Sequence, residues 1–210
     1  SSVADGGSGV TAMSDGGYIV TWLDTQVTQT NTDNTILTQR YSSDGGAVGD
    51  ATAVKVGTGG SSCTTTALSD GGYVLTWTAP DGSGYGVYSE RFDSTGTAVG
   101  DRMLVNTTTT NNQFYPAITT LSDGSYVVTW LAAEDGGTYI TSIYTQHYSS
   151  TGTAIGGETQ VNTTPVNTNL NNNPAITGLS DGGYVVSWQA ECGHGIGIYA
   201  QLSSSTGTAV

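Results

Sequence analysis

The segment SDGGYVVSW at residues 180–188 decides the fold, because three near-copies of it precede it in the chain. They are SDGGYIVTW at 14–22, SDGGYVLTW at 69–77 and SDGSYVVTW at 122–130. Each copy ends in a tryptophan, and these tryptophans follow one another at intervals of 55, 53 and 58 residues: Trp22, Trp77, Trp130 and Trp188. A repeat of about fifty residues predicts an array of equivalent supersecondary units.

The third copy, residues 101–157, shows what one unit contains. Its β-branched and aromatic runs predict strands at PAITTL (116–121), YVVTWL (126–131) and ITSIYTQHY (140–148), and ETQV (158–161) predicts a fourth. The Asp-Gly pair between the first two runs predicts a tight hairpin turn. Strong helix formers are scarce, so no helix is expected.

Four strands in a unit of about fifty residues are typical of one blade of a β-propeller. We therefore predict an all-β fold, a four-bladed β-propeller of four-stranded antiparallel blades, ordered from axis to rim as the strands occur in the chain. The whole chain, 1–210, is expected to form a single repeat domain with copies at about 1–50, 51–100, 101–157 and 158–210. The alternative is an open β-solenoid or one stretch of a longer array.

The two chain ends predict how the ring closes. The fourth copy stops at TAV, before its expected rim strand, while Val3 aligns with the rim-strand valines Val56, Val105 and Val161. Residues 1–4 are therefore expected to pair with the strand near 196–202 and to join the first and last blades, which would protect open sheet edges. The chain does not begin with Met, and we interpret it as a mature or excised piece of a longer product.

The composition limits the partners of the chain. Its 17 acidic and 4 basic residues give a formal charge of −13, which would repel nucleic acid and an anionic membrane surface. No apolar stretch approaches the roughly 20 residues that span a bilayer, so membrane insertion is not expected. Cys63 and Cys192 are too few for a disulfide framework, and the sequence leaves open whether they form one bridge.

The repeated block, with PAIT, SDGGYVVSW, GIYAQ, STGTA and QVNT in it, resembles tandem repeats of large secreted bacterial surface proteins. Such repeats often lie beside RTX or cadherin-like segments in adhesins, so the resemblance implies a secreted protein, extracellular or at the cell surface. The nonapeptide of calcium-binding RTX repeats is missing, and DGSGYG at 81–86 is only a glycine-rich loop.

Three kinds of residue recur in every copy, and each has a structural and a functional interpretation. The tryptophans alternate with Tyr and Val on one strand face, which favours packing between blades over sugar stacking. The turn aspartates are expected to stabilise turns, because one carboxylate per turn is too few for calcium. The inner-strand threonines fit a narrow axis, or their hydroxyls could hold water or an ion. The aspartates are Asp15, Asp70, Asp123 and Asp181; the threonines are Thr11, Thr66, Thr119 and Thr177.

Loops at comparable positions in the four copies are expected to lie on one face of the ring and to form a ligand-binding surface, since loops on a rigid scaffold suit recognition. The candidate residues in these loops are Asp24, Asp33, Asp81, Tyr85, Glu134, Asp135, Tyr139, Glu191 and His194. No cofactor is expected; calcium, held by the acidic loops, is the one candidate. Asn106 and Asn162 begin equivalent glycosylation sequons.

These observations predict a secreted, non-enzymatic recognition module that binds glycans or another cell-surface ligand. The alternative is a structural subunit or spacer of an extracellular filament, matrix or adhesin, with self-association. Catalysis is not expected, because His147 and His194 are the only histidines, they are not in equivalent positions, and no hydrolase or phosphate-binding motif is present.

Overall fold

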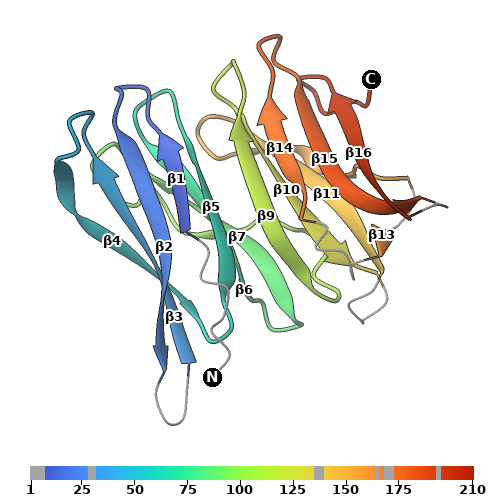
Figure 1. Cartoon of the computed structure of the whole chain (residues 1–210), viewed down its shortest axis with the longest axis horizontal. Coiled ribbons are helices and arrows are strands. Elements are labelled where there is room, and N and C mark those ends of the chain that lie inside the picture. The colour runs from blue at the N-terminus through green and yellow to red at the C-terminus, as the bar shows by residue number, and fades with distance from the viewer. Residues whose placement is uncertain (1–7, 28–31, 135–139, 164–165, 168–172, 193–194) are drawn as a thin grey trace.

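The computed structural model of the chain describes residues 1–210 except 1–7, 28–31, 135–139, 164–165, 168–172 and 193–194. Its regular elements are all β-strands, which form four antiparallel sheets arranged as the blades of a propeller (Figure 1). The all-β, four-bladed prediction is therefore confirmed. In the described part of the chain, no helix is present that is long and apolar enough to cross a membrane.

The strands follow the repeats. Blade 1 contains β1 (Ser8–Ala12), β2 (Tyr18–Val27), β3 (Thr32–Tyr41) and β4 (Ala47–Gly57). Blade 2 contains β5 (Ser61–Ala67), β6 (Tyr73–Pro80), β7 (Tyr85–Phe92) and β8 (Met103–Leu104). Blade 3 contains β9 (Gln113–Thr120), β10 (Tyr126–Ala133), β11 (Ile140–Tyr148) and β12 (Ala154–Gln160), and β13 (Val166–Asn167) pairs with β11. Blade 4 contains β14 (Ala175–Gly178), β15 (Tyr184–Cys192) and β16 (Gly195–Ser203).

The start of the inner strand of blade 3 differs from the prediction. The inner strand β9 begins at Gln113, three residues before the predicted start at Pro116, because a β-bulge lets the strand continue through Tyr115. Tyr115 has a positive φ of 54°, and Ser62 has a φ of 52° in the matching bulge of β5. A bulge inserts one residue and bends the strand. The polar residues before Pro116 have a low strand propensity, so the sequence did not predict a strand there.

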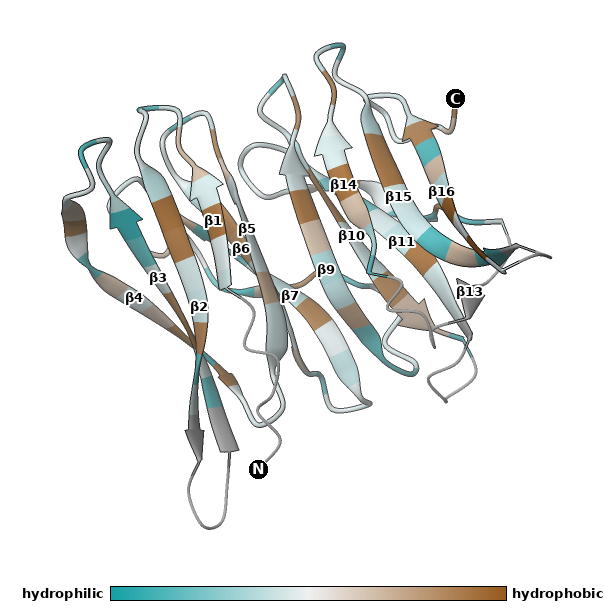
Figure 2. Ribbon diagram, in the orientation of Figure 1, coloured by the Kyte–Doolittle hydropathy of each residue, from teal (hydrophilic) through white to brown (hydrophobic). Residues whose placement is uncertain are grey.

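Each blade has two faces with different partners. We call the face that carries Ile19, Val74, Val127 and Val185 the leading face, and the face that carries the Tyr-x-Val/Leu-x-Trp row the trailing face. The leading face of blade 1 packs on the trailing face of blade 2, with Ile19 and Ile36 in one cluster with Leu75 and Trp77. The same junction joins blade 2 to blade 3 and blade 3 to blade 4. Figure 2 shows apolar bands that cross the middle of the strands.

The junctions confirm that three of the repeated tryptophans, Trp77, Trp130 and Trp188, pack between blades, whereas Trp22 belongs to none of the three core clusters. Trp77 and Trp130 are 0% and 1% exposed, and each stacks on a tyrosine of the next strand, Tyr88 or Tyr144. Near the axis, threonines of neighbouring inner strands bond to each other. Thr11 Oγ1 lies 2.5 Å from Thr65 Oγ1, and the Thr119 Oγ1 accepts the Gly178 N–H at 3.1 Å. These hydroxyls therefore join adjacent blades, as does the 3.0 Å contact between the Thr66 and Thr120 hydroxyls.

The predicted closing strand, residues 1–4, lies outside the described residues. Among the described residues, the three core clusters join blades 1 to 2, 2 to 3 and 3 to 4, and none of them joins blade 4 to blade 1. In blade 4, a bridge from Ser203 to Ala209 begins a fourth-strand pairing like those of the other blades. The leading face of blade 4 and the trailing face of blade 1 are thus the two halves of the junction that the described residues leave uncovered.

We predict that truncation of one leading-face isoleucine will show how much a blade junction contributes to the free energy of unfolding. Ile143→Ala, at a residue that is 0% exposed, is expected to lower the free energy of unfolding by about 2–5 kcal/mol, because the cavity cannot be filled. The matched control is Ile155→Ala on β12, where the side chain is 46% exposed and the loss is expected to stay within ~0.5 kcal/mol. Urea denaturation measures both, and equal losses would contradict the role of the junction.

Candidate functional site

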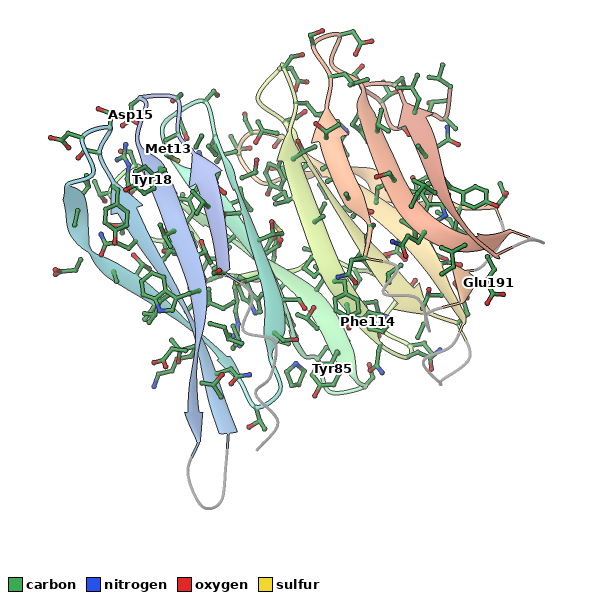
Figure 3. The ribbon with its side chains drawn as sticks, in the orientation of Figure 1. Met13, Asp15, Tyr18, Tyr85, Phe114 and Glu191 are labelled. Atoms are coloured by element: carbon green, nitrogen blue, oxygen red, sulfur yellow. The ribbon has the colours of Figure 1, made fainter. Side chains whose placement is uncertain are left out.

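The two ends of the blades carry different residue types. The hairpin turns with Asp15 lie at one end, which we call the turn end, and Tyr85, Phe114 and Glu191 lie at the opposite end, which we call the loop end (Figure 3). The loop end is where the sequence predicts a ligand-binding surface. The turn end is where the repeated aspartates lie.

The repeated aspartates stabilise turns. Asp15 Oδ1 accepts the Gly17 N–H at 3.0 Å, and the other three copies repeat the bond at 2.9–3.0 Å. The glycine after each aspartate has a φ of 83–89°, a conformation that favours glycine. The backbone N–H of Gly17, more than the nearby Arg40, lowers the pKa of Asp15. No group of three or more His, Cys, Asp or Glu side chains is placed to hold a metal ion among the residues that the structure describes.

The sequence did not predict that two of these aspartates also pair with an arginine in the third strand of the same blade. Arg40 pairs with Asp15 at 2.5 Å, and Arg91 pairs with Asp70. In blade 3, His147 takes the arginine position, and its Nε2 lies 2.8 Å from Ser125 Oγ, which donates to Asp123 at 2.5 Å. Burial lowers the pKa of His147, and the charge of Asp123 opposes that shift.

This substitution predicts a pH dependence. Because the pKa of His147 is lower in the folded state than its usual value of 6.5, protonation of this ring favours the unfolded chain. The resulting contribution to stability is fully present above the usual pKa and is lost as the pH falls through the lower folded-state pKa. His147→Arg, charged throughout, is expected to pair with Asp123 as the arginines of blades 1 and 2 pair. Urea midpoints at about pH 7.5 and 5 should fall less in the variant than in the wild type; an equal fall would contradict the assignment.

A pocket of about 190 Å³ lies at the loop end of blade 3. Two carboxylates line it: Glu134, exposed at the end of β10, and Glu158, half-buried on β12. Trp130 and Tyr144 form its aromatic wall, with ring centroids 6.2 Å apart and an angle of 20° between the ring planes. Burial, followed by the charges of Glu134 and Glu158, raises the pKa of Tyr144.

The opposite wall is the loop 106–112, which runs from blade 2 to the inner strand of blade 3. Glu158 fastens it: its Oε2 accepts the Thr107 N–H at 2.9 Å, and its Oε1 accepts the Thr108 hydroxyl at 2.5 Å. Asn106, 2% exposed, donates to Gln113 Oε1 at 3.1 Å and accepts the Val87 N–H at 2.8 Å.

The glycosylation candidates are both buried. Asn106 and Asn162 are 2% and 4% exposed, and each accepts a backbone N–H of the third strand in its blade, from Val87 or Ile143. Their role in the folded chain is therefore to hold the end of the rim strand. A buried amide with a backbone partner is not accessible to a glycosylating enzyme.

The predicted loop residues have different positions. Glu134 lines the pocket. Asp81 and Tyr85 lie in the blade 2 hairpin behind the loop 106–112, where the Tyr85 N–H donates to Asn112 Oδ1 at 3.1 Å. Asp24 and Glu191 lie on β2 and β15, away from the pocket lining. The side chains of the remaining candidates, and of one cysteine, lie outside the described residues: Asp33, Asp135, Tyr139, His194 and Cys192.

Sequence reasoning missed Glu158, although a signal for it exists. In blade 2 the aligned position holds Arg102, whose guanidinium lies 5.7 Å from the centre of the Tyr88 ring. Blade 3 therefore replaces a cation beside the stacked Trp-Tyr pair with a carboxylate. Such a change of charge between otherwise similar copies indicates that this position has a role in blade 3 beyond stabilising the repeat.

A second pocket of about 200 Å³ lies at the junction of blades 2 and 3, with Glu90, Arg91 and Asp101 in its lining. Burial raises the pKa of Glu90, and Asp101 adds to that shift while Arg102 opposes it. Arg91 in this pocket already pairs with Asp70. The loop-end pocket has two carboxylates, Glu134 and Glu158, beside two stacked aromatic rings, so we take it as the candidate functional site.

Comparison with known proteins finds the fold but no family. No family model matches the chain, and no curated protein matches it in sequence. Among solved structures, an endo-arabinase from Bacteroides thetaiotaomicron VPI-5482 matches at a TM-score of 0.54 and 14% identity, over 100% of this chain and 80% of the other. A thermostable family-43 glycoside hydrolase matches at 0.52 and 11%, over 98% and 71%. An α-L-arabinofuranosidase from Lactobacillus brevis matches at 0.51 and 14%, over 93% and 66%.

These matches correct the functional prediction. The chain was expected to be a non-enzymatic recognition module or a structural subunit, but the solved structures that match it here are glycoside hydrolases. The expectation that the chain is not an enzyme rested on the absence of hydrolase motifs, and those motifs do not describe glycosidases. Most glycosidases use two carboxyl groups that the fold brings together in space, and such a pair need not leave a short sequence motif. The chain is thus a propeller whose structural neighbours act on glycans.

Proposed function

We propose that this chain is a glycan-processing domain that hydrolyses glycosidic bonds at the loop-end pocket of blade 3. The observation that carries the proposal is the presence of Glu134 and Glu158 in one pocket, beside the stacked rings of Trp130 and Tyr144. Most glycosidases use a pair of carboxyl groups on either side of the scissile bond. The fold of the chain, shared with glycoside hydrolases, supports the same function.

The surroundings of the two carboxylates differ, which suits two roles. Glu158 is held in one orientation by the Thr107 N–H and the Thr108 hydroxyl, so it fits the carboxylate that attacks the sugar or activates a water. Glu134 lies at the exposed edge of the pocket, where it can reach a leaving group that extends into solvent. It would act as the general acid that protonates the glycosidic oxygen.

The other lining groups suit a neutral sugar. The hydroxyls of Thr108 and Thr110 and the amide of Asn111 can form hydrogen bonds with sugar hydroxyls. The half-buried ring of Tyr144 offers an apolar surface. The volume of about 190 Å³ is below the ~300–1,000 Å³ of most ligand pockets. The pocket therefore suits a single sugar residue, such as the end of a chain, with the remaining residues in solvent.

We expect the substrate to be an extracellular glycan. Polysaccharides with free chain ends are found there, and a formal charge of −13 with few cationic groups suits a secreted protein that meets neutral glycans and not nucleic acid. Partners are therefore expected to be glycans, and the chain is expected to work after secretion or at the cell surface.

The test measures release of reducing sugar from a panel of neutral oligosaccharides and polysaccharides by the wild type, Glu134→Gln and Glu158→Gln. Loss of either carboxylate is expected to lower kcat by about 10²–10⁴-fold, because each takes part in the transition state. Glu191→Gln is the matched control, since Glu191 lies exposed at the same end but outside the pocket lining.

The variants must first melt within a few degrees of the wild type, so that a loss of activity is not a loss of fold. Glu158→Gln can keep one acceptor for the Thr107 N–H and so is expected to fold. Activity that survives in both pocket variants, or an inactive wild type on the whole panel, would overturn the proposal.

A further inference from the structure

The second pocket, of about 200 Å³ between blades 2 and 3, is lined by residues at which blade 2 departs from its own repeat; we call it the junction pocket. Blade 1 shows how the repeat closes this place. The Thr38 hydroxyl lies 2.7 Å from the Tyr73 hydroxyl of the next blade, and the Thr52 hydroxyl donates to the Gly96 carbonyl at 2.8 Å. These two contacts join the third and fourth strands of blade 1 to blade 2.

Blade 2 has neither of these threonines. In its sheet Ser89 pairs with Met103, at the place where blade 1 pairs two threonines. Blade 3 keeps the threonines, as Thr145 and Thr159. Ser89 is 1% exposed, and its Oγ has no hydrogen-bond partner among the described residues. An unpaired buried hydroxyl destabilises a fold, and blades 1 and 3 avoid it at this position. The substitution therefore indicates a role other than stability.

A third substitution in blade 2 loosens the rim strand beside the pocket. In blades 1 and 3 a glutamine amide, of Gln39 or Gln146, donates to two carbonyls of the rim strand at 3.2–3.4 Å. Blade 2 has Glu90 at this position, and a carboxylate cannot donate. The rim strand β8 has 2 residues, whereas β4 and β12 have 11 and 7. Residues 99–102 lie outside any strand, and Asp101 among them lines the pocket.

We propose that the junction pocket binds one neutral sugar residue of a glycan, as a second binding site apart from the loop-end pocket. Ser89, Tyr126 and Thr151 line it with hydroxyl groups, and each hydroxyl can donate and accept, as the hydroxyls of a sugar do. Burial raises the pKa of Tyr126 to about 12, so this hydroxyl keeps its proton at neutral pH. Asp101, exposed among the lining residues, can accept further sugar hydroxyls, and Met103 offers an apolar surface to the C–H face of the ring.

The charges and the size of the pocket favour a neutral sugar over other ligands. Glu90 and Asp101 repel anions such as phosphate, while Arg91, in the same lining, pairs with Asp70. A calcium ion would have to gather about six to eight oxygen ligands beside that guanidinium. The volume of about 200 Å³ is far above the ~15 Å³ that one water needs, and it is close to that of the loop-end pocket. The junction pocket therefore suits one sugar residue better than a bridging water.

The junction pocket and the loop-end pocket lie toward opposite ends of blades 2 and 3. Arg91, which lines the junction pocket, pairs with Asp70 in a hairpin turn of the turn end. Gly152, on the wall from blade 3, lies in the turn between β11 and β12. A sugar in the junction pocket would thus hold a polysaccharide on the protein and leave the loop-end pocket open for a chain end. Binding at the junction pocket requires no catalysis at the loop end.

The test uses the two methionines of the chain as reporters, because Met103 lines the junction pocket and Met13 lies in the core cluster between blades 1 and 2. The chain, labelled with carbon-13 in the methionine methyl groups, is titrated with methyl glycosides of arabinose, galactose, glucose, mannose and xylose, and NMR records both signals. At least one glycoside is expected to shift the Met103 signal saturably, with a Kd between about 0.1 and 10 mM. The Met13 signal is expected to stay in place.

Two variants test the walls of the pocket. Asp101→Ala is expected to raise the Kd about 10-fold with an unchanged melting temperature, since the residue is exposed. Ser89→Thr restores the threonine of blades 1 and 3, so it is expected to engage the Tyr126 hydroxyl, raise the melting temperature and weaken binding about 10-fold. Asp50→Ala is the matched control and should leave the Kd unchanged, because Asp50 is the aligned exposed carboxylate of blade 1.

Three results would overturn the proposal. One is a Met103 signal that no glycoside shifts at about 50 mM, and another is an unchanged Kd in both the Asp101 and the Ser89 variants. The third is a shift that is lost in Glu158→Gln, because that loss would assign the binding to the loop-end pocket. Glu158→Gln is expected to lose hydrolysis and to keep the Met103 shift, so the sugar site and the hydrolytic function fail or stand separately.

Discussion

The contact between the leading face of one blade and the Tyr-Val-Trp row of the next is the constraint on which the rest of the structure depends. A single four-stranded sheet of about fifty residues has two faces to cover and too little mass to cover either by itself. Ile36 and Trp77, from different blades, are both fully buried only because the junction exists. The hydrogen bonds between inner-strand threonines, and those that the turn aspartates accept, add to a structure whose blade positions the junctions determine.

Much of this frame could be predicted from the sequence, because the residues that make it are local and repeat. The alternation of Tyr, Val and Trp assigned one strand face to a neighbouring blade, and the structure confirms that assignment at Trp77, Trp130 and Trp188. The Asp-Gly turns were equally readable, since the side-chain bond from Asp15 to the Gly17 N–H spans only two residues. The early start of β9 was not readable, because a bulge at Tyr115 depends on the partner strand.

The candidate site, unlike the blade junctions, could be predicted from the sequence only in part. Glu134 could be named from its place in a loop, but Glu158 lies in a rim strand and reaches the pocket only because the loop 106–112 arrives from the preceding blade. The fold alone determines how far apart Glu134 and Glu158 lie in the sequence, and no sequence motif fixes their spacing. The expectation that the chain has no enzymatic activity failed for the same reason. It relied on the absence of short sequence motifs, and two carboxylates on separate strands leave no such motif.

The junctions also determine how the chain would come apart. Each core cluster contains residues of two successive blades only, so the energy that holds a blade is a sum over its nearest neighbours, as in linear repeat proteins. Blades 2 and 3 have two such neighbours in the described structure, and blades 1 and 4 have one. Opening therefore costs least at the two outer blades, and the loop-end pocket, on blade 3 with a wall from blade 2, belongs to the part of the molecule that opens last.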